Sequence, residues 1–278
     1  MPKHLLSASQ AFDLRQALHV ATLDALLASR RWAPGELIFQ GGTSLHLTHG
    51  SPRYSEDLDF LVNASLKLDA IGNAVLARLE ALAWMPLGSR VTLKKAKDAR
   101  NPHAFVVSIT GENVIGVVRV KVELWQTAAA AMQQLKVVVA PVRLAGGLAA
   151  GMQTFVPTAD VREIYADKVF ALVARPYLKP RDVFDLHWLG AGRSALPCTA
   201  ADMRVRLLTY PNEKPLAWLA KASGRRALLL QSVPAVAKDL ARWLPSTWPL
   251  DNSAAQAMVD ASVVALDQGV MAMQEIIQ

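Results

Sequence analysis

The sequence has few of the residues on which disulfide-bonded, zinc-binding and exported proteins depend. Its 278 residues include one cysteine, Cys198, which excludes an intramolecular disulfide and a cysteine-rich zinc site and fits a reducing cytoplasm. The N-terminus is charged throughout and lacks the apolar segment of a signal peptide. The most apolar stretch, residues 137–151, is broken by Pro141, Arg143 and glycines and is too short to span a bilayer. We therefore expect a soluble, cytoplasmic protein without a membrane partner.

Acidic residues are also in deficit, with 23 Asp and Glu against 30 Lys and Arg, which gives a formal net charge of +7. The excess is concentrated at residues 90–100 and 201–242. Such patches can hold a polyanion such as RNA, with Tyr210, Trp218 or Trp243 available to stack on bases. The ordinary alternative is a set of solvated surface charges and tryptophans that fill the core.

The segment from Phe39 to Phe60 carries the strongest functional signal. Residues 36–40 are typical of a short apolar strand, and Gly41-Gly42-Thr43-Ser44 then form a strand-to-helix turn at which backbone N–H groups can approach phosphate. Thr43 or Ser44 is a candidate helix cap or phosphate ligand. Residues 55–62 alternate as a strand does, so Asp57 and Asp59 share one face. Two carboxylates on one face can share a Mg²⁺ ion.

This order of elements, strand, Gly-Gly, helix and strand with D-x-D, resembles the polymerase-beta-like nucleotidyltransferases, which need a third carboxylate on a neighbouring strand. Residues 104–110 and 114–124 are predicted to form a hairpin. Its second arm places Arg119, Lys121 and Glu123 on one face. Glu123 is the candidate third ligand. The alternative is that these three residues form a ladder of solvent-facing charges.

A second cluster lies in residues 157–190. Lys168 falls in or beside the apolar stripe of a predicted helix, where its ammonium either extends to solvent or meets an anion. On the next predicted helix, residues 182–189, Asp182 and Asp185 are three residues apart, and Arg181 precedes Asp185 by four. These charges can pair on one face, which alone would indicate an ordinary surface salt-bridge set.

Together these motifs resemble the AbiEii/AbiGii family of nucleotidyltransferase toxins of type IV toxin–antitoxin systems, which is related to the MenT enzymes. The family pattern consists of GG(T/S)xL, R-x-S-x-D-x-D, K-x-x-A-L and R-D-x-x-D-L. The chain matches these four blocks in order, at Gly41–Leu45, Arg53–Asp59, Lys168–Leu172 and Arg181–Leu186. The resemblance covers residues 41–186 and does not extend usefully over the last ninety or so.

The resemblance implies a role for each matched residue. Triphosphate binding falls to the Gly-Gly turn, metal binding to the D-x-D pair, and a phosphate or nucleotide contact to the lysine. The last motif supplies an essential acidic group and an arginine near the nucleotide. The implied set is Gly41, Gly42, Thr43, Ser44, Asp57, Asp59, Lys168, Arg181, Asp182 and Asp185, with Glu123 as the third metal ligand.

The expected fold is α+β, with a polymerase-beta-like mixed sheet and helices in residues 1–156. A mostly helical domain, residues 157–278, is expected to complete the active-site cleft. The expected function is Mg²⁺-dependent transfer of a nucleotide from an NTP to an acceptor hydroxyl. The resemblance points to RNA such as the tRNA 3′ end as the acceptor, and to a cognate antitoxin as a partner. The alternatives are a small-molecule or protein nucleotidyltransferase and an inactive binding protein on the same fold.

Overall fold

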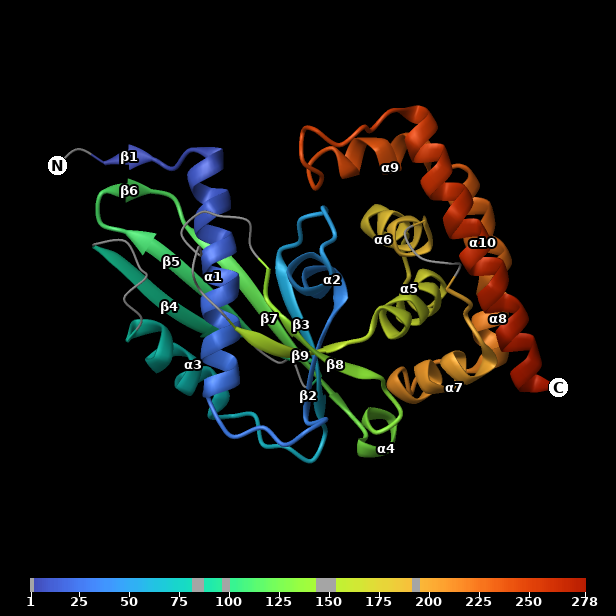
Figure 1. The fold of residues 1–278 in the computed structure, drawn as a ribbon, viewed down its shortest axis with the longest axis horizontal. Coiled ribbons are helices and arrows are strands. Elements are labelled where there is room, and N and C mark those ends of the chain that lie inside the picture. Colours follow the sequence, from blue (N-terminus) through green and yellow to red (C-terminus); the bar gives the residue numbers. More distant parts are fainter. Residues whose placement is uncertain (1–2, 82–87, 97–100, 144–153, 192–195) are drawn as a thin grey trace. The chain divides into compact units, whose positions relative to one another are not determined.

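The computed structural model describes residues 3–81, 88–96, 101–143, 154–191 and 196–278. Their contacts divide the chain into two compact units, shown as a ribbon in Figure 1. The first comprises residues 1–50, 56–132 and 137–158, and the second comprises residues 51–55, 133–136 and 159–278. Two short segments of the N-terminal half, Ser51–Ser55 and Gln133–Lys136, therefore belong with the helical second unit.

The first unit is built on a mixed seven-stranded sheet in the order β4-β5-β7-β3-β2-β9-β8. A separate pair of two-residue strands, β1 and β6, runs parallel. The elements of this unit are β1 (His4–Leu5), α1 (Ala8–Ala28), β2 (Leu37–Gln40), α2 (Gly41–His49), β3 (Asp57–Asn63), α3 (Ile71–Glu80), β4 (Ser89–Lys95), β5 (His103–Gly111), β6 (Val114–Ile115), β7 (Val118–Thr127), α4 (Ala129–Met132), β8 (Val137–Pro141) and β9 (Phe155–Ala159).

The centre of the sheet is the parallel pair β3 and β7, which lie side by side in Figure 1. A parallel pair needs a crossover, and here the chain passes through α3, β4 and β5 before returning as β7. β5 then pairs antiparallel with β7, as the predicted hairpin requires. The second arm starts at Val118 and not at Val114, because Val114–Ile115 form β6 and pair with β1.

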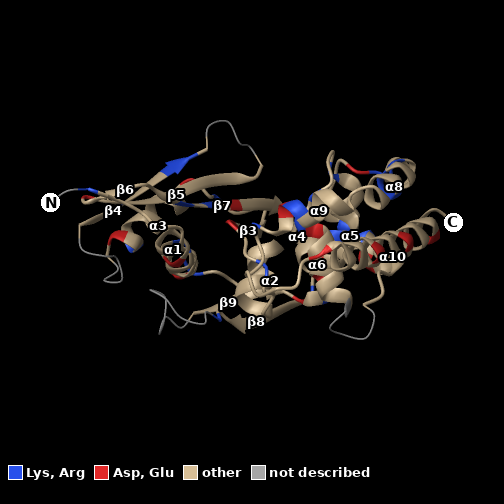
Figure 2. Cartoon of the chain, turned by 90° about the horizontal axis from the view of Figure 1, so that it is seen from above, with Lys and Arg blue, Asp and Glu red and all other residues tan. Residues whose placement is uncertain are grey.

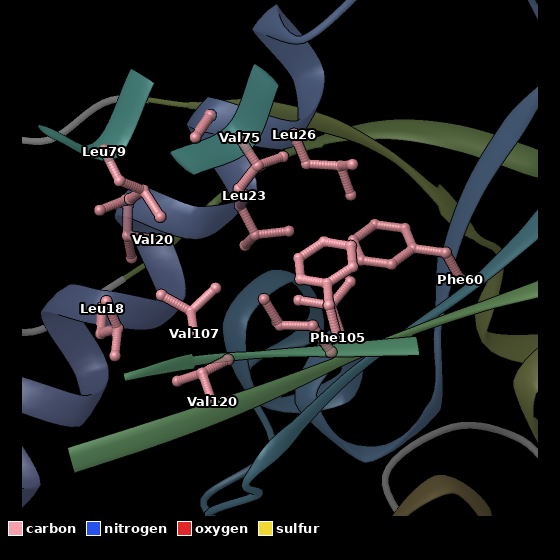
Figure 3. Close-up of a cluster of buried hydrophobic side chains, with 14 of the residues drawn as sticks. Leu18, Val20, Leu23, Leu26, Phe60, Val75, Leu79, Phe105, Val107 and Val120 are labelled. Carbon is pink, nitrogen blue, oxygen red and sulfur yellow. The ribbon is translucent and has the colours of Figure 1, made fainter. Parts of the chain in front are cut away.

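Alternation along β3 and β7 separates a buried face of the sheet from a charged one. Leu58, Phe60, Val120, Val122 and Leu124 are fully buried. Helices α1 and α3 supply Leu18, Leu23, Val75 and Leu79 to the same apolar cluster, part of which is drawn in Figure 3. Burying these side chains stabilises the sheet by about 1.5–3 kcal/mol for each large one. The charged residues of β3 and β7 lie on the opposite face.

Helix α1 is capped at its N-terminus and contacts the residue before β3. It begins with a capping box, in which Ser7 accepts a hydrogen bond from the Gln10 N–H and the Gln10 side chain accepts one from the Ser7 N–H. Further along, the buried His19 donates through Nε2 to the carbonyl oxygen of Glu56 at 2.8 Å. Burial lowers the pKa of His19 to about 4. The neutral imidazole therefore anchors the residue that precedes Asp57.

The second unit is helical. It contains α5 (Val161–Ala174), α6 (Pro180–Ala191), α7 (Ala200–Thr209), α8 (Pro215–Leu230), α9 (Val233–Leu240) and α10 (Asn252–Ile277). Helix α10 packs against the other five. Gly269 permits its close approach to α5, because a Cβ at that position would lie 2.6 Å from the side chain of Val169. The expected α+β class, a mixed sheet with helices followed by a mostly helical part, is confirmed.

No helix in these described ranges combines the length and the apolar character needed to cross a membrane. The apolar segment 137–151 begins as the sheet strand β8, and its residues from 144 onward lie outside the described ranges.

Candidate active site

Four charged residues share one face of the sheet at its centre. In the register of β3 and β7, Asp57 lies opposite Lys121 and Asp59 lies opposite Glu123. Because these strands run parallel and in register, paired residues point to the same side. The structure thus brings Glu123 next to the D-x-D pair, as the sequence analysis predicted, and adds Lys121 to the group. All four residues are partly exposed.

Gly41 lies directly against one of these carboxylates. It has φ +78°, and a Cβ built on it would lie 2.8 Å from Oδ2 of Asp59. Both facts require glycine, since a side chain would be strained by the backbone and would push Asp59 away. Gln40 pairs with Asp59 across β2 and β3. The start of α2 and the Asp59 carboxylate are therefore neighbours.

Helix α2 starts earlier than the sequence analysis predicted. Its first residue is Gly41 and its N-cap is Gln40, without a side-chain cap, so neither Thr43 nor Ser44 caps it. Both hydroxyl groups are completely buried. Thr43 donates to the carbonyl oxygen of Asp57, and Ser44 shares a hydrogen bond of 2.6 Å with Thr158. The side chains of this turn thus hold β3 and β9, which leaves the backbone N–H groups of the first helical turn to meet an anion.

Lys121 neutralises part of the carboxylate face. Its ammonium forms an ion pair with Glu123. The hydrogen bond to Glu123 and the nearby charges of Asp57 and Asp59 raise the pKa of Lys121, although partial burial opposes them. Lys121 and Glu123 are thus paired with each other on the face that also carries Asp57 and Asp59.

The carboxylate groups on this face are of the chemical type that binds Mg²⁺. Carboxylate oxygens are the ligands that Mg²⁺ prefers, and one or two of them suffice when substrate phosphates and water complete its shell. Among the described residues, no group of three or more His, Cys, Asp or Glu side chains is arranged to hold a metal ion. Asp57, Asp59 and Glu123 supply carboxylates of the kind that Mg²⁺ binds, and Glu123 forms an ion pair with Lys121.

The second unit contains a buried network of charges around Lys168. The Lys168 ammonium lies 2.5 Å from Oδ1 of Asp182 and 2.8 Å from Oδ2 of Asp185. Arg53 donates to both oxygens of Asp185, at 2.7 and 2.8 Å. These four residues are at most 5% exposed. Lys168 therefore meets two anions of its own chain and does not extend to solvent.

The charges of this network stabilise one another. Burial alone would neutralise the carboxyl groups, but Arg53 and Lys168 lower the pKa of Asp185. Lys168 and Arg175 lower that of Asp182. Burial also opposes the charged form of Lys168, yet the two carboxylates raise its pKa. All of these groups remain ionised, and together they join α5, α6 and the segment Ser51–Ser55.

The pairing predicted within the last motif is wrong. Arg181 does not pair with Asp185, which is bound by Arg53 and Lys168; its guanidinium lies over the ring of Trp243, 4.5 Å from the centroid. Arg53, which lies ahead of the D-x-D pair, binds Asp185, and Glu56 forms an ion pair with Arg15. The i,i+4 spacing on helix α6 thus allowed a local pairing that tertiary packing overrode.

The expected aromatic platform for RNA is also corrected. Trp218 is fully buried and donates to the carbonyl oxygen of Phe170, so it belongs to the core. The Tyr210 ring packs tilted against that of Phe170, and its hydroxyl donates to Asp167. The guanidinium groups of Arg181 and Arg242 both lie over the ring of Trp243, at 4.5 and 5.9 Å from its centroid.

The basic segment 201–242 is partly internal. Arg206 is buried in an ion pair with Glu163 at 2.6 Å, and the buried Arg225 donates to the carbonyl oxygen of Arg175. Exposed basic residues remain on α8, which are coloured in Figure 2. In the other basic segment Arg90, Lys94 and Lys95 are exposed on β4, whereas residues 97–100 lie outside the described ranges.

Sequence reasoning missed two members of the charged clusters. Arg175 ends α5 and reaches Asp182 across the turn between α5 and α6, a contact for which the spacing gives no signal. The strand pattern predicted that Lys121 shares a face with Glu123. Its position opposite Asp57 depends on the register of β3 with β7, which only the tertiary structure shows.

Replacing Gly41 by alanine should cost more stability than the same change at Gly35. Both residues have φ +78°, but a Cβ at Gly35 meets no atom within 4 Å, whereas at Gly41 it meets Asp59. We expect Gly35→Ala to lower the free energy of unfolding by about 1 kcal/mol and Gly41→Ala by at least about 2 kcal/mol. Urea denaturation measures both. Equal losses would contradict the close contact with Asp59.

Replacing Asp185 by asparagine should destabilise the protein strongly. The variant leaves two buried cations with one carboxylate fewer, which costs on the order of 3 kcal/mol. The control Asp267→Asn removes the partner of Arg226 in a half-exposed ion pair and should cost less than about 1 kcal/mol. Denaturation at neutral pH compares the two, and similar small losses would refute the buried network.

The pH dependence of stability provides a second readout of the same change. Because the folded pKa of Asp185 lies below its ordinary value of 3.8, its contribution is complete above about pH 4 and is lost as the pH falls through the folded pKa. Asp185→Asn should therefore weaken the acid-induced loss of stability, with Asp182 supplying the remainder. An unchanged acid limb would show that Asp185 does not titrate abnormally.

The chain is similar to a known protein family in sequence and to solved structures in fold. The profile of the family described as nucleotidyl transferase AbiEii toxin, type IV TA system, matches residues 24–246. Among curated proteins no sequence matches significantly. MenT4, a nucleotidyltransferase toxin from Mycobacterium tuberculosis, superimposes with a TM-score of 0.58 at 16% identity, over 95% of this chain and 89% of its own. JHP933 from Helicobacter pylori superimposes with a TM-score of 0.51 at 17% identity, over 98% of this chain and 100% of its own.

At these identities the structural likeness shows a shared fold. The family match covers most of the chain, including both the carboxylate face and the Lys168 network. The chain therefore belongs to the AbiEii family of nucleotidyltransferase toxins of type IV toxin–antitoxin systems.

Proposed function

We propose that this protein transfers a nucleotide from an NTP to a hydroxyl group of RNA, such as the 3′ end of tRNA, with release of pyrophosphate. Membership in the family implies an NTP substrate and an antitoxin partner. The RNA acceptor, the Mg²⁺ ion and the roles of individual residues belong to the proposal. The observation that carries it is the register of β3 and β7, which gathers Asp57, Asp59 and Glu123 on one face beside the start of α2.

In this proposal Asp57 and Asp59 hold Mg²⁺, with Glu123 as a third carboxylate. A bound Mg²⁺ neutralises charge on the triphosphate and favours ionisation of the attacking hydroxyl. Gly41 and Gly42 leave room for the triphosphate, and the backbone N–H groups of the first turn of α2 donate to it. Thr43 and Ser44 keep that turn in place through their internal hydrogen bonds.

Lys168, Asp182 and Asp185 act in this proposal through the charge of their network. Arg53, Lys168 and Arg175 carry three positive charges, against two negative charges on Asp182 and Asp185. The surplus of one positive charge favours an anion such as a phosphate group. The acidic pair keeps Lys168 and Arg53 in fixed positions, and such preorganised charges are those that stabilise a transition state. That this network and the carboxylate face serve one active site stays a prediction.

An assay of nucleotide transfer tests the proposal. The purified protein is incubated with Mg²⁺, each α-labelled NTP in turn and total tRNA, and the RNA is resolved on a denaturing gel. We expect label on tRNA, and we expect Asp57→Ala to reduce it by at least about a hundredfold. Asp69→Ala, which removes an exposed carboxylate from the same unit, should leave labelling unchanged.

The alternatives give different results in the same assay. Label on protein or on an added small hydroxyl compound, with none on RNA, would indicate another acceptor. Labelling that survives in Asp57→Ala would contradict the assignment of the D-x-D pair. No transfer and no pyrophosphate release with any acceptor would favour a protein that only binds.

A further inference from the structure

The register of β3 and β7 places a basic residue, Lys121, opposite Asp57. Its ammonium is bound to Glu123, and the charges of Asp57 and Asp59 act on it as well. Its side chain is 43% exposed, in contrast to the buried Lys168. It is therefore a partly exposed cation on the face that carries the three carboxylates.

The charge of Lys121 reduces the repulsion among the carboxylates around it. Three carboxylates on adjacent strands repel one another, and an ammonium group among them reduces that repulsion. A divalent cation supplies the same compensation with twice the charge. The two cannot both remain close to Glu123 without repulsion, and the flexible four-carbon stem of lysine allows the ammonium to leave.

We propose that Lys121 is a built-in counter-cation, which occupies the carboxylate face in the metal-free protein, is displaced by the divalent cation, and thereby weakens metal binding. The inference rests on the proposed function, because it takes this face to be the metal site. The metal ion then binds in exchange for the ammonium group. Bound nucleotide should strengthen metal binding, because its phosphate groups supply further ligands.

The test is a titration of the full-length protein with Mn²⁺, followed by the electron paramagnetic resonance signal of the free ion, in the absence of nucleotide. Removing one positive charge about 5 Å from a divalent ion should tighten binding about tenfold in Lys121→Gln. Lys121→Arg keeps the charge and should stay within about twofold of the unmodified protein. Arg119→Gln removes an exposed charge two residues away on the same face and should have a similarly small effect, because solvent screens it.

A second readout does not depend on measuring affinity. Without metal, Lys121→Gln should lower the melting temperature, because the carboxylates lose their counter-charge. Mn²⁺ should then raise the melting temperature of this variant more than that of the unmodified protein.

The outcomes separate the two proposals. Mn²⁺ binding that is lost in Asp57→Ala but unchanged or weakened in Lys121→Gln would overturn the counter-cation role and leave the metal site standing. Absence of Mn²⁺ binding in both the unmodified protein and Lys121→Gln, without nucleotide and with it, would overturn both.

Discussion

The parallel register of β3 against β7 is the constraint on which the rest of the structure depends. It is fixed by the apolar residues of the two strands, which α1 and α3 cover, since a slip of either strand by one residue would turn its own apolar side chains, Phe60 on β3 or Val122 on β7, out of the core. The same register determines that Asp57 and Asp59 stand beside Lys121 and Glu123. The chemistry of one face is thus set by the packing of the other.

In the helical unit, charged residues form a buried network instead of a partly exposed face. Its buried cations and carboxylates hold α5, α6 and Ser51–Ser55 together, and the last of these segments ends two residues before β3. Burying so many charges is costly unless each is paired, and Arg53 and Lys168 meet that condition through Asp185. Lys121 and Lys168 are consequently unlike: one is partly exposed and able to leave its partner, whereas the other is fixed between two carboxylates.

Much of this arrangement could be predicted from the sequence, because its local patterns are strong. Alternation around Asp57 and Asp59 predicted the strand and its polar face, and the alternation that includes Glu123 predicted a neighbouring strand. The family resemblance supplied the α+β class. The rest depends on long-range packing: Arg53 reaches Asp185 across 132 positions of the chain, and no local spacing encodes that distance. Arg181 and Trp218 were misjudged for the same reason, since spacing on a helix does not reveal which neighbour fills each face.

The central claim is that the face formed by β3 and β7 holds the metal and the nucleotide. A crystal structure with Mn²⁺ and a non-hydrolysable NTP, recorded at the manganese absorption edge, tests it most directly. We expect an anomalous peak at a coordination distance of about 2 Å from the carboxylates of Asp57 and Asp59, with the triphosphate at the first turn of α2. A peak elsewhere, or a nucleotide bound away from β3, would contradict it.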